Sequence, residues 1–385
     1  MKRKHVIGIL ALVAIAGTLF LILRNQQDTN DKAVLFAANL PLTGDLAVYG
    51  EAVKRGVELA QDDFQSQGSV GKRIVVDWQD NASDAKTAAS VMQKQLLKQP
   101  KLYMSGVRPQ TMAIWEGISG ANVPHFVWIF ERIINPDRHH RNNFRTWVNL
   151  KDEAKVYLEY VNYKQAKRVA ILHAQLPSYQ DEFDKDVIPA LKEQGVEVFV
   201  DTYPFDGADY RTLSARVKEF KPDLTILGGL QTHLVGLVRA MRPLNLIRDG
   251  NTITTYDLLD ASEVLGPDEL EGIRLVAPTF VSRPNEKKVV SWTAKFERKF
   301  RVSPLYTDAY AYDMMLVIQD AVSRLPETPT YDDWINSIRA TDIEGVTGPL
   351  RFDADGSLFA SIEVAFFQNG KVTPETDNVP VEIAK

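Results

Sequence analysis

Short apolar runs alternate with stretches of helical periodicity along most of this chain, and that alternation limits the fold more than any other feature. Residues 34–38 form an apolar run long enough for one buried strand. Residues 41–50 predict a loop, because proline and glycine interrupt the pattern. Apolar side chains then recur at helical spacing up to Phe64, and Gly56 lies on the same face, where we expect close contact between helix and sheet. Strand, loop and helix in this order predict an α/β fold, in which ligands bind beyond the carboxyl ends of the strands.

The second half of the chain repeats this organisation. Residues 74–106 run in the order strand, acidic loop, helix, proline and a strand that ends in glycine, and residues 198–229 follow the same order. Strands that alternate with helices predict parallel sheets. We therefore predict two similar α/β lobes, each a parallel sheet flanked by helices, with a cleft between them. After residue 278 the pattern predicts three helices, over residues 291–300, 309–324 and 331–339, and then a hairpin before Asn369–Gly370.

Composition limits the possible functions. The 385 residues are too many for one ordinary domain and suit two or three of ~150 residues each. The net charge is −5 and no basic run with interleaved aromatic residues occurs, so we expect no nucleic-acid partner. The chain has no cysteine, which excludes disulfides, thiol catalysis, thiolate metal sites and a lipoprotein-type cysteine anchor.

The first residues predict export. Residues 2–4 are basic and precede an uncharged apolar run from Val6 to Leu23. This run is just long enough to span a membrane, so we expect an uncleaved anchor followed by a polar tether over residues 24–32. The alternative is a signal peptide cleaved after the small residues 14–16. In both cases the basic residues stay inside, and the body lies outside the cytoplasm, in the periplasm or at the cell surface, touching the membrane only through residues 1–32.

Enzyme motifs are missing from the sequence. It has no Walker loop, no GxGxxG and no HExxH, and residues 117–120 have the wrong spacing for a nucleophile elbow. His139 and His140 with Asp137 resemble a metal site, but adjacent histidines of an extended loop point apart, and a solvated loop is the preferred interpretation. We therefore expect a protein that is not an enzyme and that holds neither a metal nor a cofactor.

Aromatic and polar side chains gather in the loops after the predicted strands, as they do in small-molecule sites. The predicted ligand-binding residues are Tyr49, Arg108, Gln110, Thr111, Trp128, Phe130 and Glu131 in the first lobe, and His173, Tyr179, Gln231, Tyr256 and Asp257 in the second. Arg108 stands at the start of a predicted helix, whose free N–H groups favour an anion. The alternative is that Arg108 pairs with Glu131 as part of the scaffold. His173 is, as a lone histidine, more often polar lining or structural than a catalytic base.

The chain resembles the leucine/isoleucine/valine-binding protein family of ABC importers, the type I periplasmic binding proteins, from residue 34 to about residue 371. The residues that carry the resemblance are Pro41–Gly44 with Tyr49–Gly50, the acidic loop 77–84, Leu172–His173 with Ser178–Tyr179, Gly228–Gly229, and residues 308–313, 348–353 and 355–356. The family implies two lobes that are joined by three crossovers and close over a ligand. The resemblance implies crossovers near residues 149–150, 277–278 and 348–349, so that lobe 1 is 33–149 with 279–348 and lobe 2 is 150–278 with 349–385.

The resemblance also implies a function, with one departure in the site. Tyr49 and Tyr179 match family tyrosines that contact the ligand. Amino-acid binders of the family hold the ligand carboxylate with serine and threonine hydroxyls after the third and fourth strands, where this chain has Pro109–Gln110 and residues 129–131. We therefore expect an organic acid whose anionic end contacts Arg108. An amino acid stays possible if Asp257 or Glu131 accepts the ammonium group.

The predicted function follows from these points. We expect an extracytoplasmic solute-binding protein that captures a small anionic or amino-acid-like ligand and delivers it to ABC permease subunits. The alternative is a membrane-anchored ligand sensor or regulator with the same fold.

Overall fold

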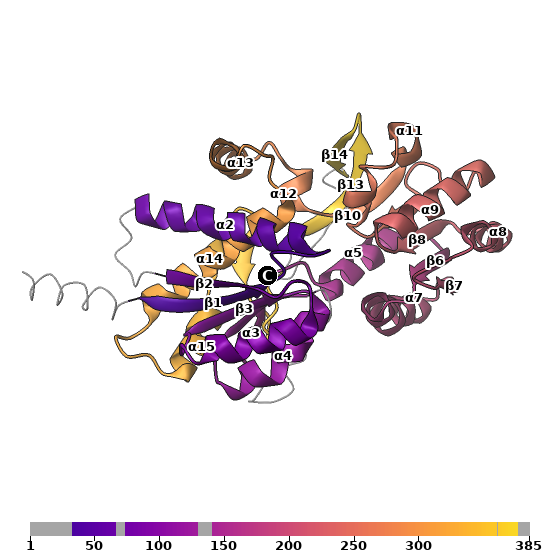
Figure 1. Cartoon of the computed structure of the whole chain (residues 1–385). Coiled ribbons are helices and arrows are strands. Elements are labelled where there is room, and N and C mark those ends of the chain that lie inside the picture. Colours follow the sequence, from indigo (N-terminus) through magenta and orange to yellow (C-terminus); the bar gives the residue numbers. More distant parts are fainter. Residues whose placement is uncertain (1–32, 67–73, 130–140, 360, 376–385) are drawn as a thin grey trace, which may run out of the picture.

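The computed structural model describes residues 33–66, 74–129, 141–359 and 361–375, and it contains two large sheets, each covered by helices (Figure 1). The first sheet has five parallel strands in the order β2-β1-β3-β4-β5. Its strands are β1 (Val34–Leu40), β2 (Ile74–Asp80), β3 (Leu102–Gly106), β4 (His125–Trp128) and β5 (Asn143–Arg145). We call this sheet and the helices packed on it lobe 1.

The second sheet has seven strands in the order β14-β13-β10-β9-β8-β6-β7. Its strands are β6 (Arg168–Ala174), β7 (Glu197–Tyr203), β8 (Leu224–Gly228), β9 (Thr252–Thr254), β10 (Ile273–Pro278), β13 (Ile362–Gln368) and β14 (Lys371–Pro374). Strands β6 to β10 are parallel, and β13 and β14 join them antiparallel. We call this sheet with its helices lobe 2. The predicted α/β fold of two lobes is confirmed, and the hairpin β13–β14 is an antiparallel addition.

Local sequence accounts for several element ends. Asp84 accepts a hydrogen bond from the backbone N–H of Thr87 and thereby caps α3 (Ala85–Leu96), as the sequence predicts. The turn between β13 and β14 has φ of 53° at Asn369 and 74° at Gly370. Two successive positive φ values are those of a tight hairpin turn, which asparagine and glycine adopt at low cost.

Lobe 1 is closed by helices from both ends of the chain. Its helices are α2 (Ala47–Ser66), α3, α4 (Arg108–Gly120), α13 (Lys287–Phe300), α14 (Tyr306–Arg324) and α15 (Tyr331–Arg339). The short strands β11 (Asp342–Glu344) and β12 (Pro349–Arg351) pair with each other. A Cβ added to Gly56 of α2 would stand 2.2 Å from the backbone oxygen of Asp308 of α14. The close contact expected at Gly56 is thus with a helix, not with the sheet, and an Arg55–Asp308 ion pair of 2.9 Å lies beside it.

Lobe 2 is covered by shorter helices. They are α5 (Leu150–Tyr163), α6 (Pro177–Tyr179), α7 (Ile188–Glu193), α8 (Tyr210–Phe220), α9 (Gln231–Met241), α10 (Leu258–Ala261), α11 (Pro267–Leu270) and α12 (Thr279–Ser282). A 3-10 turn η2 (Arg242–Leu244) follows α9, and a π-helix η1 (Gln180–Val187) connects α6 to α7.

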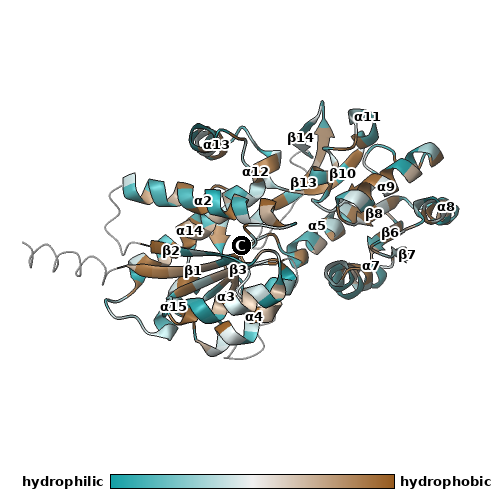
Figure 2. Ribbon diagram, in the orientation of Figure 1, coloured by the Kyte–Doolittle hydropathy of each residue, from teal (hydrophilic) through white to brown (hydrophobic). Residues whose placement is uncertain are grey.

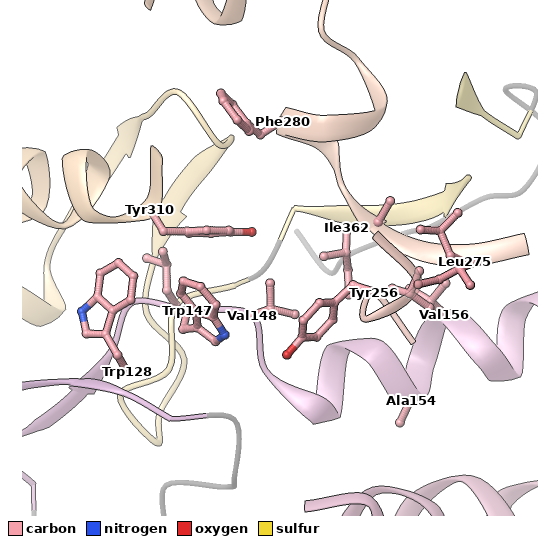
Figure 3. Close-up of a cluster of buried hydrophobic side chains, with 14 of the residues drawn as sticks. Trp128, Trp147, Val148, Ala154, Val156, Tyr256, Leu275, Phe280, Tyr310 and Ile362 are labelled. Carbon is pink, nitrogen blue, oxygen red and sulfur yellow. The ribbon is translucent and has the colours of Figure 1, made fainter. Parts of the chain in front are cut away.

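Hydrophobic residues are concentrated on the strands, and the outward faces of helices such as α2 and α13 are hydrophilic (Figure 2). The buried core is continuous through the junction of the lobes, from Trp128 in lobe 1 to Leu275 in lobe 2 (Figure 3). In the described part of the chain, no helix has both the length and the hydropathy needed to cross a bilayer. The predicted anchor at residues 6–23 lies outside the described residues.

Candidate functional site at the junction of the lobes

Aromatic rings from both lobes meet at the junction. Trp128 at the end of β4 lies 4.9 Å from Trp147, centroid to centroid. Trp147 lies 5.4 Å from Tyr306 and 5.5 Å from Tyr310, both on α14. From lobe 2, the ring of Tyr256 lies 6.1 Å from that of Tyr306. These five residues, which we call the junction aromatics, form a largely buried aromatic cluster to which both lobes contribute.

Asp257 is the carboxylate of lobe 2 that lies next to these rings. It follows β9 and is 8% exposed. Its Oδ2 accepts hydrogen bonds from the hydroxyls of Tyr179, at 2.8 Å, and Thr255, at 3.0 Å. Burial raises the pKa of Asp257 to about 6, although the two hydrogen bonds act in the opposite direction. A carboxylate held in this way can accept an ammonium group at neutral pH.

Tyr49, on lobe 1, interacts electrostatically with the same carboxylate. It lies in the first turn of α2 and is 39% exposed. Burial raises the pKa of its hydroxyl, and the charges of Asp260 and Asp257 raise it further. Burial and the charges of the same two carboxylates also raise the pKa of the Tyr306 hydroxyl. In addition to burial, the charge of Asp257 therefore raises the pKa of one tyrosine hydroxyl on each lobe, that of Tyr49 on lobe 1 and that of Tyr179 on lobe 2.

Two more carboxyl groups of lobe 2, those of Glu153 and Glu182, are fully buried and interact electrostatically with Asp257. Glu153 on α5 accepts a hydrogen bond of 2.9 Å from the hydroxyl of Tyr157, and burial together with Asp257 raises its pKa to about 8. Glu182 lies on η1, and burial with the charges of Glu153 and Asp257 raises its pKa well above the ordinary value. We call Glu153, Glu182 and Asp257 the lobe-2 carboxyl cluster. No group of three or more acidic or histidine side chains in the described residues is arranged to hold a metal ion.

The start of α4 forms the lobe-1 side of the predicted site. Arg108 is its first residue and is exposed to solvent. Val107, just before it, has a φ of 66°, a conformation that costs a β-branched residue on the order of 1–3 kcal/mol. Gln110 is buried and its amide donates a 2.6 Å hydrogen bond to the backbone oxygen of Ser83, which fixes this loop against its neighbour.

Two of the predicted residues point into the lobes and not to the junction. Thr111 is fully buried, and its hydroxyl lies 2.9 Å from that of Ser105, which lies 2.8 Å from Nε2 of His125. Nδ1 of His125 lies 3.1 Å from the side-chain oxygen of Asn143. This serine–histidine–asparagine chain resembles a catalytic triad, but all of its members are buried within the lobe-1 sheet, where no substrate can reach them.

His173 is likewise buried in lobe 2. Its ring stacks on Phe183 at 5.1 Å, and Nδ1 lies 3.1 Å from the backbone oxygen of Ala174. Desolvation lowers the pKa of His173, so the ring is uncharged at neutral pH and its role is structural. Gln231 opens α9 and donates a 2.8 Å hydrogen bond to the backbone oxygen of Asp260, beside the cluster. Phe130 and Glu131 lie outside the described residues.

Five residues of the junction were missed from the sequence: Trp147, Tyr306, Tyr310, Glu153 and Glu182. Trp147 follows β5, a three-residue strand that gave no pattern, and Tyr306 precedes the predicted start of its helix. Glu182 lies on the π-helix, and the hydrophobic periodicity of the sequence does not predict such a wider turn. Glu153 had a usable signal, because it shares the apolar face of α5 with Val156 and Tyr157, and an acidic residue on such a face is unusual.

Comparison with known proteins identifies the family. Residues 34–370 match the family model described as periplasmic binding protein. The chain belongs to the periplasmic binding protein family. Among its curated relatives is Leu/Ile/Val-binding protein homolog 2 of Brucella abortus, 26% identical over 95% of this chain and 96% of the relative. The Leu/Ile/Val-binding protein of Citrobacter freundii is 24% identical over 89% of this chain and 92% of its own length.

Solved structures show the same fold. A putative branched-chain amino acid ABC transporter from Rhodospirillum rubrum superposes with a TM-score of 0.74 at 20% identity, covering 89% of this chain and 100% of that one. A solute binding protein of an R. palustris ABC transporter, solved with benzoate, has a TM-score of 0.69 at 17% identity and covers 89% and 95%.

Family membership settles two of the earlier expectations. Periplasmic binding proteins are solute-binding proteins and not enzymes, so the buried serine–histidine–asparagine chain has a structural role. The family also indicates an extracytoplasmic location for this periplasmic binding protein.

Proposed function

We propose that this periplasmic binding protein captures a small amino-acid-like ligand or organic acid between its lobes and delivers it to the permease of an ABC importer. The observation that carries the proposal is that the ring of Tyr256, next to the buried Asp257 of lobe 2, lies 6.1 Å from the ring of Tyr306 on lobe 1, while Tyr179 donates a hydrogen bond to Asp257. A ligand seated there contacts both lobes at once, and such contacts favour a closed arrangement over an open one. The relatives named for leucine, isoleucine and valine, and the neighbour with benzoate, support these two ligand classes.

The charges of the two sides suggest how a zwitterion is held. Asp257 supplies a negative group on lobe 2, and the first turn of α4 with Arg108 supplies positive potential on lobe 1. In this proposal Asp257 accepts the ammonium group, Arg108 contacts the carboxylate, and Trp128, Tyr256, Tyr49 and Tyr179 surround the body of the ligand. Gln110 and Gln231 contribute polar groups from the neighbouring loops.

The lobe boundaries belong to the same proposal. Lobe 1 consists of residues 33–149 with 279–348, and lobe 2 of residues 150–278 with 349–385. The strand pairing supports the first boundary, because β5 ends at Arg145 and β6 begins the second sheet at Arg168. Two features differ from the proposed division: α12 (Thr279–Ser282) packs on β10 and β13 of lobe 2, and β12 (Pro349–Arg351) pairs with β11 of lobe 1 before β13 returns to the second sheet at Ile362. Hinge motion at the three crossovers then opens and closes the site.

A ligand screen tests the proposal. A ligand at ~100 times its dissociation constant stabilises the folded state by about 2.7 kcal/mol, which raises the melting temperature by several degrees. Binding next to Trp128 and Trp147 should also change tryptophan fluorescence. Asp257→Asn should abolish both responses to an amino acid, whereas Asp268→Asn, at an exposed position on α11, should keep them. If amino acids, aromatic acids and other organic acids all leave melting and fluorescence unchanged, the binding function is refuted.

We further propose that residues 6–23 anchor the protein in the cytoplasmic membrane. The uncharged apolar run after three basic residues supports this. Mass measurement of protein from native membranes should give the uncleaved chain, and a mature N-terminus at Gly17 in the soluble fraction would contradict it. An anchored protein that binds its ligand but does not stimulate the ATPase of any importer in vesicles would favour the sensor alternative.

A further inference from the structure

A pocket opens on lobe 1 at the end of its sheet that is opposite to the junction. It is lined by side chains from residues 96–101, 121–124 and 329–334, and we call it the distal pocket. The first two segments come directly before β3 and β4, whereas Trp128 of the junction is the last residue of β4. Because β3 and β4 are parallel, the two places are separated by the length of β4, roughly 13 Å. Helix α15, which forms the third wall, lies on the side of lobe 1 away from lobe 2 (Figure 1).

The distal pocket has the size and the walls of a small-molecule site. Its volume is about 280 Å³, slightly below the usual range of ~300–1,000 Å³ for ligand pockets. Its apolar wall contains the rings of Trp334 and Tyr331 on α15 together with Pro100 and Pro124. Trp334 is only 4% exposed, so packing holds its ring in place. Flat rings and prolines in one small wall favour a ligand with a planar apolar body.

The rim of the distal pocket carries a lysine without a charged partner. Lys101 is exposed, and its ammonium group makes no ion pair or side-chain hydrogen bond in the part of the chain that the structure describes. The other cation nearby is already paired: Arg141 lies 5.3 Å from the ring of Tyr331 and forms an ion pair with Asp332. Lys101 is therefore the group that can contact a charged ligand here.

The ends of two helices must be weighed against this lysine. Helices α3 and α4 both end at the distal pocket, and the partial negative charge of a helix C-terminus favours a cation. Their last turns, however, are closed by the chain itself, because the N–H of Gln99 donates to the oxygen of Leu96 and the N–H of Asn122 to that of Ser119. The ammonium group of Lys101 carries a full charge, and the side-chain amides of Gln99 and Asn122 are further donors on the rim. The rim thus complements a carboxylate.

We propose that the distal pocket is a second ligand site of this protein and that it binds an aromatic carboxylate. The planar ring of the ligand packs against Trp334, Pro100 and Pro124, and its carboxylate contacts Lys101. This inference goes beyond the proposed solute-binding function and does not depend on it, because the distal pocket consists of lobe-1 residues alone. A ligand bound there stabilises lobe 1 without bringing the lobes together.

Fluorine NMR of the full chain labelled with 5-fluorotryptophan tests the inference, because it reports the distal pocket and the junction separately. The chain has six tryptophans, and the resonances missing from Trp334→Phe and Trp128→Phe assign one reporter to each place. The probes are 1-naphthoate, the uncharged 1-naphthylmethanol and the cation 1-naphthylmethylammonium. We expect 1-naphthoate to shift the Trp334 resonance saturably, the alcohol to bind more weakly, and the ammonium compound to bind most weakly.

Three variants define the site. Lys101→Gln should weaken 1-naphthoate binding about fivefold, the effect of one charge at ~4 Å in water, and remove the preference for 1-naphthoate over the alcohol. Lys86→Gln, at an exposed position near the other end of α3, is the matched control and should change neither. Ala121→Phe, at an exposed position of the pocket wall, places a ring in the cavity and should abolish the shift of the Trp334 resonance.

The inference is overturned if no probe shifts the Trp334 resonance, or if the ammonium compound binds more tightly than 1-naphthoate. It is also overturned if Ala121→Phe leaves binding unchanged, or if Lys101→Gln keeps the full preference for 1-naphthoate over the alcohol. The two proposals fail separately. A probe that shifts only the Trp128 resonance supports binding at the junction and overturns the distal site. A shift of the Trp334 resonance alone supports the distal site even when the ligand screen for the junction is negative.

Discussion

Replacing Glu153 by glutamine should change how the stability of the protein depends on pH. The glutamine has the same shape, and its side-chain oxygen can keep the hydrogen bond from the hydroxyl of Tyr157, which is 2.9 Å in the native protein. Burial, and secondly the charge of Asp257, raise the pKa of Glu153 from 4.5 to about 8. In the unfolded chain the same group is exposed and has its ordinary pKa. Between these two values the folded protein binds close to one proton more than the unfolded chain.

The sign and size of the effect follow from proton linkage. A group whose pKa is raised on folding contributes stability below its unfolded pKa, and this contribution is lost as the pH rises towards the folded pKa. One extra proton corresponds to about 1.4 kcal/mol for each pH unit, so the native protein loses about 3 kcal/mol relative to Glu153→Gln between pH ~5.5 and pH ~7.5. Because the charges of Asp257 and Glu182 interact with Glu153, the difference between the two proteins measures Glu153 together with its coupling to these groups.

Urea unfolding followed by tryptophan fluorescence at several pH values measures this difference. The free energy of unfolding of the native protein should fall relative to that of Glu153→Gln as the pH rises. The free energy of unfolding of the control Glu193→Gln, changed at an exposed position, should vary with pH as that of the native protein does. A constant difference between native protein and Glu153→Gln across this range, or one of the opposite sign, would refute the reasoning.

Three further expectations concern packing and backbone. Gly56→Ala places a methyl group against the backbone of α14 and should lower the free energy of unfolding by roughly 1–3 kcal/mol. The control Gly120→Ala places its methyl group in free space and should not destabilise the protein. Equal effects of the two variants in thermal or urea unfolding would contradict this. Asp313→Asn replaces one of the two buried carboxylate oxygens that accept three hydrogen bonds from residues 346–347 by an NH2 donor, and should cost about 2–4 kcal/mol with faster hydrogen exchange there. Unchanged exchange would argue against it. Val107→Gly relieves a positive φ and should raise stability by up to about 1 kcal/mol, and a clear loss would show that the side chain outweighs the strain.

Features that depend on neighbouring residues were predicted well. Alternation of apolar runs and helical periodicity gives the strands and helices of both lobes, because side-chain burial follows the period of the element. The cap at Asp84 and the turn at Asn369–Gly370 follow from the chemistry of a few adjacent residues. Trp128 and Tyr256, at the ends of strands of the two lobes, both lie among the junction aromatics.

The junction itself was decided by tertiary structure. Trp147 and Tyr306 are far apart in the chain, yet their rings lie 5.4 Å apart, and Gly56 meets a helix that begins at Tyr306. Thr111 and His173 were predicted to line the site, but Thr111 lies on the buried face of α4 and His173 on a strand within lobe 2, and both side chains are in the core. A side chain at a loop or strand end has the same sequence signature whether it points inward or outward. The buried carboxyl cluster arises because α5, η1 and the loop after β9 meet in space, and burial by remote segments leaves no local pattern.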